Sequence, residues 1–209
     1  MNAYITADRI GSNTGGGVVT FNELEALKSL GETVPITVNH AIPSPDPFHE
    51  DREILWRLQR ELKKHPDHQP GISHCYAGCL SETVRWLKAN NWKVTYTCAA
   101  HDIEVSKREH EKLGWPFAYP HLVDPELWKR YSQGYMDADV LIVPSSVSAN
   151  TVTRQGRVGK VEIIPHGVNL PEKIAPLPSF FKVGYLGAIG PDKGLFYLLQ
   201  AWKKLNYKD

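Results

Sequence analysis

Short apolar, β-branched runs alternate along this chain with segments whose apolar positions recur every three or four residues. Such alternation predicts strands followed by amphipathic helices, which is the pattern of an α/β protein with a parallel sheet. In the first repeat, residues 2–7 are predicted to form a strand, and the helix after it is predicted to stop at Gly31. The apolar positions of that helix are Val18, Phe21, Leu24 and Leu27.

The same pattern continues along the rest of the chain. Residues 140–143 are wholly apolar, as in a parallel strand that is buried on both faces, and Ser145 and Ser146 follow where a helix N-cap belongs. Together the elements predict a doubly wound parallel sheet. Further strands are predicted at residues 34–39, 72–76, 93–99, 140–143, 161–164 and 181–186, and further helices around residues 54–62, 80–87, 103–113, 124–136 and 195–205.

A segment with three prolines divides the chain after residue 170, and prolines stiffen a linker. We therefore assign residues 1–170 to one domain, residues 171–180 to a linker, and residues 181–209 to the first strand–helix unit of a second, truncated domain. The last helix carries an apolar stripe, which we expect to dock on the first domain, to pair with another copy of the chain, or to be mobile. The stripe consists of Leu195, Leu198, Leu199, Trp202 and Leu205.

Composition narrows the class of protein. Hydrophobic residues make up 42% and charged residues 22%, as in ordinary globular domains. Because 24 Lys and Arg nearly balance 23 Asp and Glu, there is no broad basic field for nucleic acid, and we expect no such partner. There is no secretory signal pattern and no apolar run long enough to span a membrane, so the expected location is the cytoplasm.

The three cysteines do not form a metal motif. Cys75, Cys79 and Cys98 are an odd number, which favours reduced thiols over a disulfide framework. The spacing of Cys75 and Cys79 beside His74 differs from that of a zinc knuckle. We expect small buried residues there and no metal.

Glycines follow the first predicted strand. Gly15, Gly16 and Gly17 end a predicted loop, residues 11–17, between the first strand and the first helix, at the carboxyl edge of the sheet where α/β proteins bind ligands. The free N–H groups of a helix N-terminus attract an anion such as a phosphate, although glycine is also common in plain turns. The third glycine of a dinucleotide fingerprint is missing, and the second strand ends without an acidic residue at Val38-Asn39-His40, so NAD(P) is not expected.

Two further groups could act at the same edge. His101 and Asp102 follow the strand at residues 93–99 directly. A histidine there can stabilise a developing charge, or it can simply cap the next helix, for which Asp102 is the better N-cap. Lys193 lies in Gly187-x-x-Gly190-x-x-Lys193-Gly194, where a strand passes into a helix and a point charge suits a phosphate.

Taken in order, four stretches resemble the group 1 retaining glycosyltransferases, whose GT-B fold consists of two Rossmann-like domains facing a cleft. The chain would then be the N-terminal, acceptor-side domain with the start of the donor-binding domain. The four stretches are Gly15-Gly16 with Phe21, Glu23, Leu24 and Leu27; Thr97 to Asp102; Ile163-Ile-Pro-His-Gly-Val-Asn169; and Val183 to Trp202 with Gly187, Lys193-Gly194 and Leu198-Leu199-x-Ala201-Trp202.

The resemblance implies transfer of a sugar, with retention, from a nucleotide-diphosphate-sugar donor to a glycan, lipid or small-molecule acceptor, without metal or cofactor. It implies that Gly15 and Gly16 approach the donor diphosphate and that His101 reaches the donor sugar as the catalytic-site residue. It also implies that Lys193 neutralises the leaving diphosphate. The family's arginine just after the glycine is Ala188 here, which removes one charge from that clamp.

The resemblance also sets limits. The family's pair of donor-domain glutamates would fall beyond Asp209, and 209 residues are fewer than two such domains need, so we expect the isolated chain to be inactive. Two other classes stay open, namely a GT-B sugar-nucleotide epimerase and a non-catalytic binding domain. Peripheral association with a membrane and self-association through the Leu195–Leu205 helix stay open as well.

Overall fold

The computed structural model divides the chain into two units. The first, the sheet unit, comprises Met1–His101 and His121–His166, and the second, the small unit, comprises Asp102–Pro120 and Gly167–Asp209. The structure describes residues 3–7, 10–11, 15–37, 46, 48–76, 80–98, 103–117, 124–167, 173 and 181–206.

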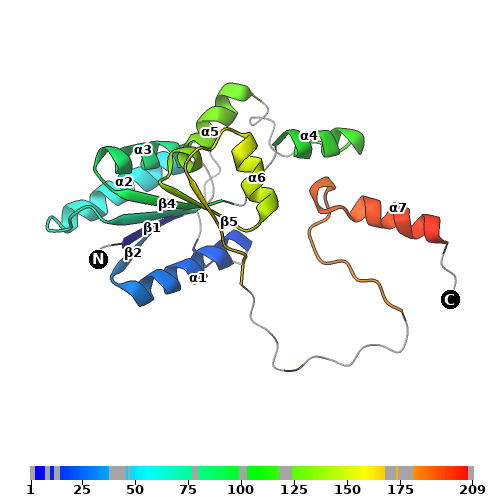
Figure 1. Ribbon diagram of the computed structural model, residues 1–209, viewed down its shortest axis with the longest axis horizontal. Coiled ribbons are helices and arrows are strands. Elements are labelled where there is room, and N and C mark those ends of the chain that lie inside the picture. The colour runs from blue at the N-terminus through cyan, green and yellow to red at the C-terminus, as the bar shows by residue number, and fades with distance from the viewer. Residues whose placement is uncertain are drawn as a thin grey trace. The chain divides into compact units, whose positions relative to one another are not determined.

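Six parallel strands form the sheet, in the order β2-β1-β3-β4-β5-β6 (Figure 1). The sheet pairs Ala7 with Thr37 on one side and with Tyr76 on the other, so the carboxyl ends of these three strands are level. The strands are β1 (Ala3–Ala7), β2 (Thr33–Thr37), β3 (Ile72–Tyr76), β4 (Lys93–Thr97), β5 (Val140–Val143) and β6 (Lys160–Ile163).

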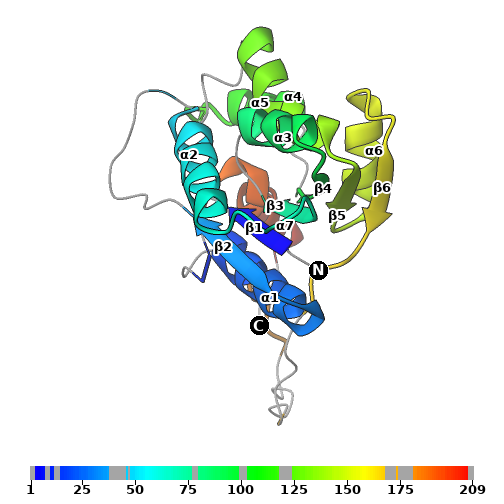
Figure 2. The ribbon, with the colours of Figure 1, turned by 90° about the vertical axis from the view of Figure 1, so that its left-hand side faces the viewer.

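Helices cover both faces of this sheet (Figure 2). Crossovers between parallel strands are right-handed, so the connection outward from β1 to β2 lies on the opposite face from the connections that run back toward β6. The helix α1 makes the first connection, and α2, α3, α5 and α6 make the others. The bounds of these helices are Gly15–Leu30 for α1, His49–Lys64 for α2, Ser81–Ala89 for α3, Pro125–Asp137 for α5 and Ser146–Arg154 for α6.

The main hydrophobic core lies between the sheet and the face that α2, α3, α5 and α6 cover. Alternate strand residues point into this core, because successive side chains of a strand face opposite sides. At β3, for example, Cys75 faces the core while His74 and Tyr76 face α1. The fully buried side chains of the core include Tyr4, Ile54, Leu58, Leu80, Val84, Leu87, Val94, Tyr96, Leu141, Val143 and Val152.

The six-stranded parallel sheet with helices on both faces confirms the α/β, Rossmann-like part of the predicted fold class. The strands at residues 72–76 and 140–143 have the predicted bounds, and the other four strands of the sheet have bounds close to the predicted ones. Ser145 caps α6 as predicted, since its side chain accepts a hydrogen bond from the backbone N–H of Ser148 at 3.1 Å.

The predicted strand at residues 181–186 is wrong, because this segment has no regular secondary structure. A β-strand needs another strand alongside it, and the described residues of the small unit include no other strand. A favourable apolar pattern is therefore not sufficient to form a strand here.

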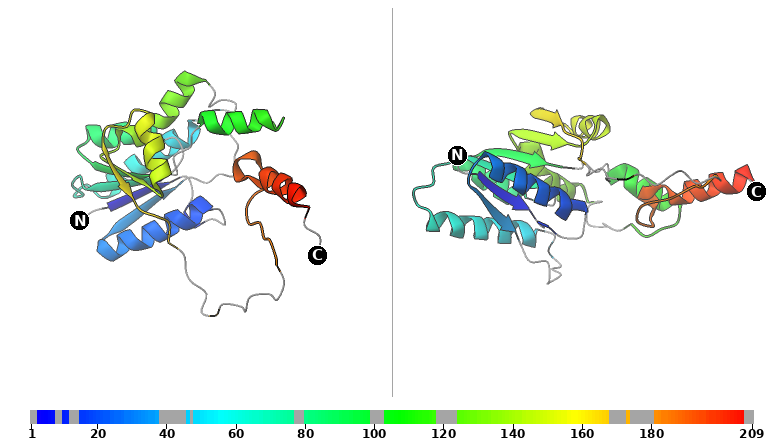
Figure 3. Two further views of the ribbon diagram at one scale, coloured as in Figure 1. Left: turned by 45° about the vertical axis from the view of Figure 1, so that its right-hand side comes forward. Right: turned by 90° about the horizontal axis from the view of Figure 1, so that it is seen from below.

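The small unit joins two parts of the chain that are distant in sequence. It contains α4 (Ile103–Lys112), the short 3-10 helix η2 (Pro191–Lys193) and α7 (Leu195–Leu205), with η2 in contact with α4 (Figure 3). The Trp115 ring lies 5.3 Å from that of Phe196, and Tyr197 donates a hydrogen bond to Glu109. The structure thus groups α4, which the sequence places in the domain 1–170, with the C-terminal segment.

The apolar stripe of α7 is only partly accounted for by this packing. The helix contacts α4 through Tyr197 and contacts Trp115, just after α4, through Phe196, and none of its residues is buried. Leu199 and Leu205 are 56% and 70% exposed. The contacts with Glu109 and Trp115 therefore involve a neighbouring face of α7, while Trp202 of the predicted stripe stacks on Phe181 and Leu199 and Leu205 remain exposed.

A buried carboxylate joins α2 to the start of α3. Asp51 is fully buried, and its side chain accepts hydrogen bonds from the backbone N–H groups of Glu82 and Thr83 at 2.6 and 3.0 Å and from the Thr83 hydroxyl at 2.7 Å. Burial raises the pKa of Asp51, and the three donors oppose that rise. Asp51 thus caps α3 from another helix, a role that the sequence did not reveal.

Candidate functional site

The chain reverses its direction across the sheet between β1 and β3. The connection from β1 leads to β2 on one side, whereas all later strands add on the other side. Such a switch point leaves a crevice at the carboxyl ends of the two strands, where α/β proteins bind ligands. The helix that follows β1 begins at Gly15, so Gly15, Gly16 and Gly17 form its first turn and not the end of a loop as predicted.

Gly16 brings the start of α1 close to the end of β3. A Cβ atom at Gly16 would lie 3.3 Å from Cε1 of Tyr76 and 3.5 Å from its hydroxyl oxygen. The 3.3 Å contact is tighter than most contacts of a real Cβ atom, so with a larger residue the Tyr76 ring would have to shift by a few tenths of an ångström. The glycine therefore has a packing role at the switch point, whatever else it does.

The first turn of α1 has the character of an anion site. Its first N–H groups lack partners within the helix, and the helix dipole adds partial positive charge there. No acidic residue lies in this turn to neutralise that charge. The hydroxyl of Thr20 donates to the carbonyl oxygens of Gly16 and Gly17 at 3.1 and 3.0 Å, which fixes the glycine backbone.

The strand that leads to the predicted histidine ends close to this region. β4 lies beside β3 in the sheet, with Thr97 paired to Tyr76, and its Thr97 is buried. The backbone N–H of Cys98 continues the pairing by donating to Ile142 at 3.0 Å. His101 and Asp102 themselves lie outside the described residues, so their predicted roles stay predictions.

Lys193 belongs to the small unit and not to the sheet unit. It is exposed and ends η2, where its backbone N–H donates to the carbonyl of Gly190 at 3.2 Å. Gly194 follows in the left-handed conformation, with φ of +71°, before α7 begins. Lys193 thus precedes α7 and does not lie in its first turn. A positive charge in that first turn would be repelled by the positive end of the helix dipole.

Ala188 is uncharged at the position where the resemblance expects an arginine. Its carbonyl oxygen accepts a hydrogen bond from the Tyr185 hydroxyl at 2.7 Å. Between Gly187 and Gly194, Lys193 supplies a positive charge and Ala188 supplies none.

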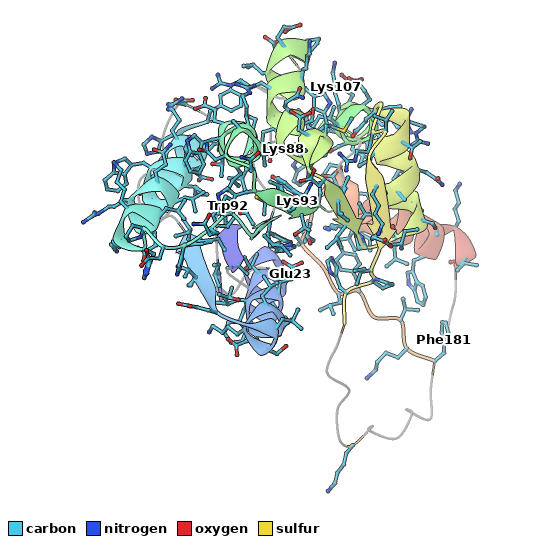
Figure 4. The ribbon with its side chains drawn as sticks, turned by 60° about the vertical axis from the view of Figure 1, so that its left-hand side comes forward. Glu23, Lys88, Trp92, Lys93, Lys107 and Phe181 are labelled. Carbon is cyan, nitrogen blue, oxygen red and sulfur yellow. The ribbon has the colours of Figure 1, made fainter. Side chains whose placement is uncertain are left out.

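A buried polar cluster under α1 was missed by the sequence reasoning. The ring of His74 is 7% exposed, and its Nδ1 lies 2.7 Å from the hydroxyl of Thr95. Its Nε2 lies 3.2 Å from a carboxylate oxygen of Glu23, which projects from α1 (Figure 4). A polar residue in a strand buried on both faces was the available signal, because such a side chain needs a partner.

The cysteines have no arrangement for metal or nucleophilic chemistry in the described part of the chain. Cys75 is fully buried, and burial raises its thiol pKa to about 12, so it stays protonated. Cys79 lies outside the described residues. Among those that are described, no group of three or more His, Cys, Asp or Glu residues is placed to hold a metal ion.

None of the helices that the structure describes is long and apolar enough to cross a lipid bilayer. The sequence matches no model of a known protein family, and no curated protein is significantly similar to it.

Proposed function

We propose that this chain is the acceptor-side part of a retaining glycosyltransferase of the GT-B type. It would bind a nucleotide-diphosphate sugar as donor. The observation that carries the proposal is the position of the glycine-lined start of α1, at the switch point between β1 and β3. A diphosphate there would accept hydrogen bonds from the backbone N–H groups of Gly15 and Gly16.

The remaining roles follow from the resemblance. His101 would orient the donor sugar near the reacting carbon, and Lys193 would neutralise the leaving diphosphate. Residues 181–209 would be the first unit of a truncated second Rossmann-like domain that carries this lysine. Because Ala188 contributes no charge, one cationic side chain fewer than in the family pattern would contact the diphosphate. Donor binding should be correspondingly weak.

Calorimetric titration of the chain with uridine, guanosine and adenosine diphosphate sugars tests donor binding. We expect heat with at least one donor, and competition by inorganic pyrophosphate. The variant Lys193→Ala should weaken binding about tenfold or more, as for loss of a hydrogen bond to a charged group. The matched control is Gly167→Ala, since a Cβ at Gly167 meets nothing within 4 Å.

Two results would contradict the proposal. Absence of heat with every donor would favour a non-catalytic binding domain. Binding that is unchanged in Lys193→Ala and in Gly16→Ala would place the ligand elsewhere. Sustained transfer by the chain alone would contradict its assignment as an incomplete enzyme, and product formation without an acceptor would favour an epimerase.

A further inference from the structure

His110 is a buried histidine whose two ring nitrogens both face oxygen atoms. It lies on α4 and is 5% exposed. Nδ1 lies 2.8 Å from the carbonyl oxygen of Pro116, and Nε2 lies 3.4 Å from a carboxylate oxygen of Asp192 in η2. The ring of Phe117 packs against it edge-on, with the ring centroids 5.3 Å apart.

A neutral ring of His110 cannot satisfy both the carbonyl oxygen at Nδ1 and the carboxylate at Nε2. A backbone carbonyl can only accept a hydrogen bond, so Nδ1 of His110 must carry a proton to donate to Pro116. In the neutral imidazole Nε2 is then bare, and its lone pair faces the carboxylate of Asp192. Only the imidazolium, with protons on both nitrogens, satisfies Pro116 and Asp192 together.

Asp192 also anchors the turn that carries Lys193. Its second carboxylate oxygen accepts a hydrogen bond from the Ser106 hydroxyl on α4 at 2.8 Å. Asp192 is therefore held to α4 at two points, one of which depends on the proton at Nε2. Since Lys193 is the next residue, the same contacts fix where η2 presents its charge.

The other charged groups around His110 have partners of their own. On α4, Glu109 accepts from Tyr197 of α7 and pairs with Lys112 at 2.8 Å. Lys107 and Glu111 lie 3.9 Å apart, as do Arg108 and Glu109. Asp192 is the charged group that lies directly against the imidazole in the described part of the small unit.

We propose that His110 is a proton-dependent latch between α4 and the η2 turn. With both nitrogens protonated, the ring bridges Pro116 and Asp192 and holds the turn on α4. Loss of the Nε2 proton places a lone pair against the carboxylate, and the turn is released from this point. Histidine is the side chain whose charge ordinarily changes between pH 5 and 8, which makes pH the variable that tests the latch.

His74 is also buried beside a carboxylate, but its contacts do not depend on its protonation state. Its Nδ1 faces the hydroxyl of Thr95, which can donate as well as accept. A neutral His74 can therefore accept from Thr95 at Nδ1 and keep a proton on Nε2, which lies 3.4 Å from the hydroxyl of Thr97 and 3.2 Å from a carboxylate oxygen of Glu23. No protonation change is needed to keep its contacts, and His74 serves as the internal comparison.

Nuclear magnetic resonance on the full chain tests the latch. Fluorine-labelled tryptophan reports on Trp115, whose ring contacts Phe196 of α7, and Trp115→Phe assigns its signal. The variant Phe196→Ala shows where the Trp115 signal lies when the contact between the two rings is absent. In the wild type, the Trp115 signal should move toward that position as the pH rises from 5 to 8.

The variant that tests the latch is Asp192→Asn. Its control is Glu109→Gln, which also replaces one carboxylate between α4 and the C-terminal segment by an amide. An asparagine amide can accept from Ser106 and donate to a bare Nε2, so the Trp115 signal should stay at its contact position across the pH range. Glu109→Gln should move as the wild type does. An unmoved wild-type signal, or an Asp192→Asn signal that moves as far as the wild type, would overturn the latch.

A direct measurement on the wild type keeps the test independent of any variant. Side-chain nitrogen spectra should show neutral His110 with its proton on Nδ1 at high pH and a second proton on Nε2 at low pH. A neutral tautomer with its proton on Nε2 would overturn the proposal, because that form donates to Asp192 without any added proton.

Discussion

Gly134 lies inside α5, at a position where helix propensity and packing make opposite predictions for alanine. In an exposed helix, replacing glycine by alanine stabilises by about 1 kcal/mol. At Gly134, however, a Cβ atom would lie 3.0 Å from the carbonyl carbon of Leu80, 3.1 Å from its oxygen and 3.1 Å from the backbone nitrogen of Ser81. These are backbone atoms, so no side-chain rotation relieves the contact.

The start of α3 cannot easily move away from α5. Its first backbone N–H groups are held by the buried carboxylate of Asp51. Overpacking in a dense interior costs about 1–3 kcal/mol, which exceeds the gain in helix propensity. We therefore expect Gly134→Ala to lower the free energy of unfolding by about 1–2 kcal/mol. In a unit of this size that is a fall in Tm of about 3–8 °C.

Urea and thermal unfolding followed by circular dichroism measure this effect. Gly167→Ala is the control, because a Cβ there meets nothing within 4 Å, and its stability should change by less than about 0.5 kcal/mol. If Gly134→Ala unfolds at the same urea concentration as the wild type, or at a higher one, the close approach of α5 to α3 is not as the structure has it.

Three further predictions concern buried or paired groups of the sheet unit. Asp51→Ala should cost about 2–4 kcal/mol in urea unfolding because the donors at the start of α3 lose their acceptor, and an unchanged midpoint would refute that cap. Burial works against the ionisation of Asp139, but the backbone N–H of Val94 and the ammonium of Lys88 outweigh it and hold its pKa below the ordinary value. The stabilisation that Asp139 provides is therefore present above that ordinary value and lost as the pH falls through its lowered pKa. Asp139→Asn should be destabilised by about 1 kcal/mol at pH 7, and the difference from the wild type should shrink as the pH falls below the ordinary pKa of an aspartate; a constant difference would contradict this. Cys75, with its pKa raised to about 12 by burial, should stay unmodified by iodoacetamide in native protein at pH 8 and react fully in urea, as mass spectrometry of the peptides would show.

The candidate site was predictable from sequence only where local backbone chemistry decides the outcome. Gly15 and Gly16 were recognised because glycine between a strand and a helix has a local meaning. The contact between Gly16 and Tyr76 could not be read in that way, since it joins residues of separate strand–helix repeats. The pairing of His74 with Glu23 was hidden for the same reason.

What the sequence by itself determined is the succession of strands and helices in the sheet unit. Apolar periodicity, helix caps and turn residues act within a few positions of the chain, so Ile72–Tyr76, Val140–Val143 and the cap at Ser145 follow from local order. Tertiary structure alone decided which of the apolar segments became strands, since residues 181–186 have a strand pattern but no strand beside them. It also decided that α4 belongs with η2 and α7, because that grouping depends on contacts such as Ser106 with Asp192, between residues far apart in the chain. Long-range contacts of this kind depend on which surfaces meet in space. The spacing of residues along one segment does not show which other segment it will contact.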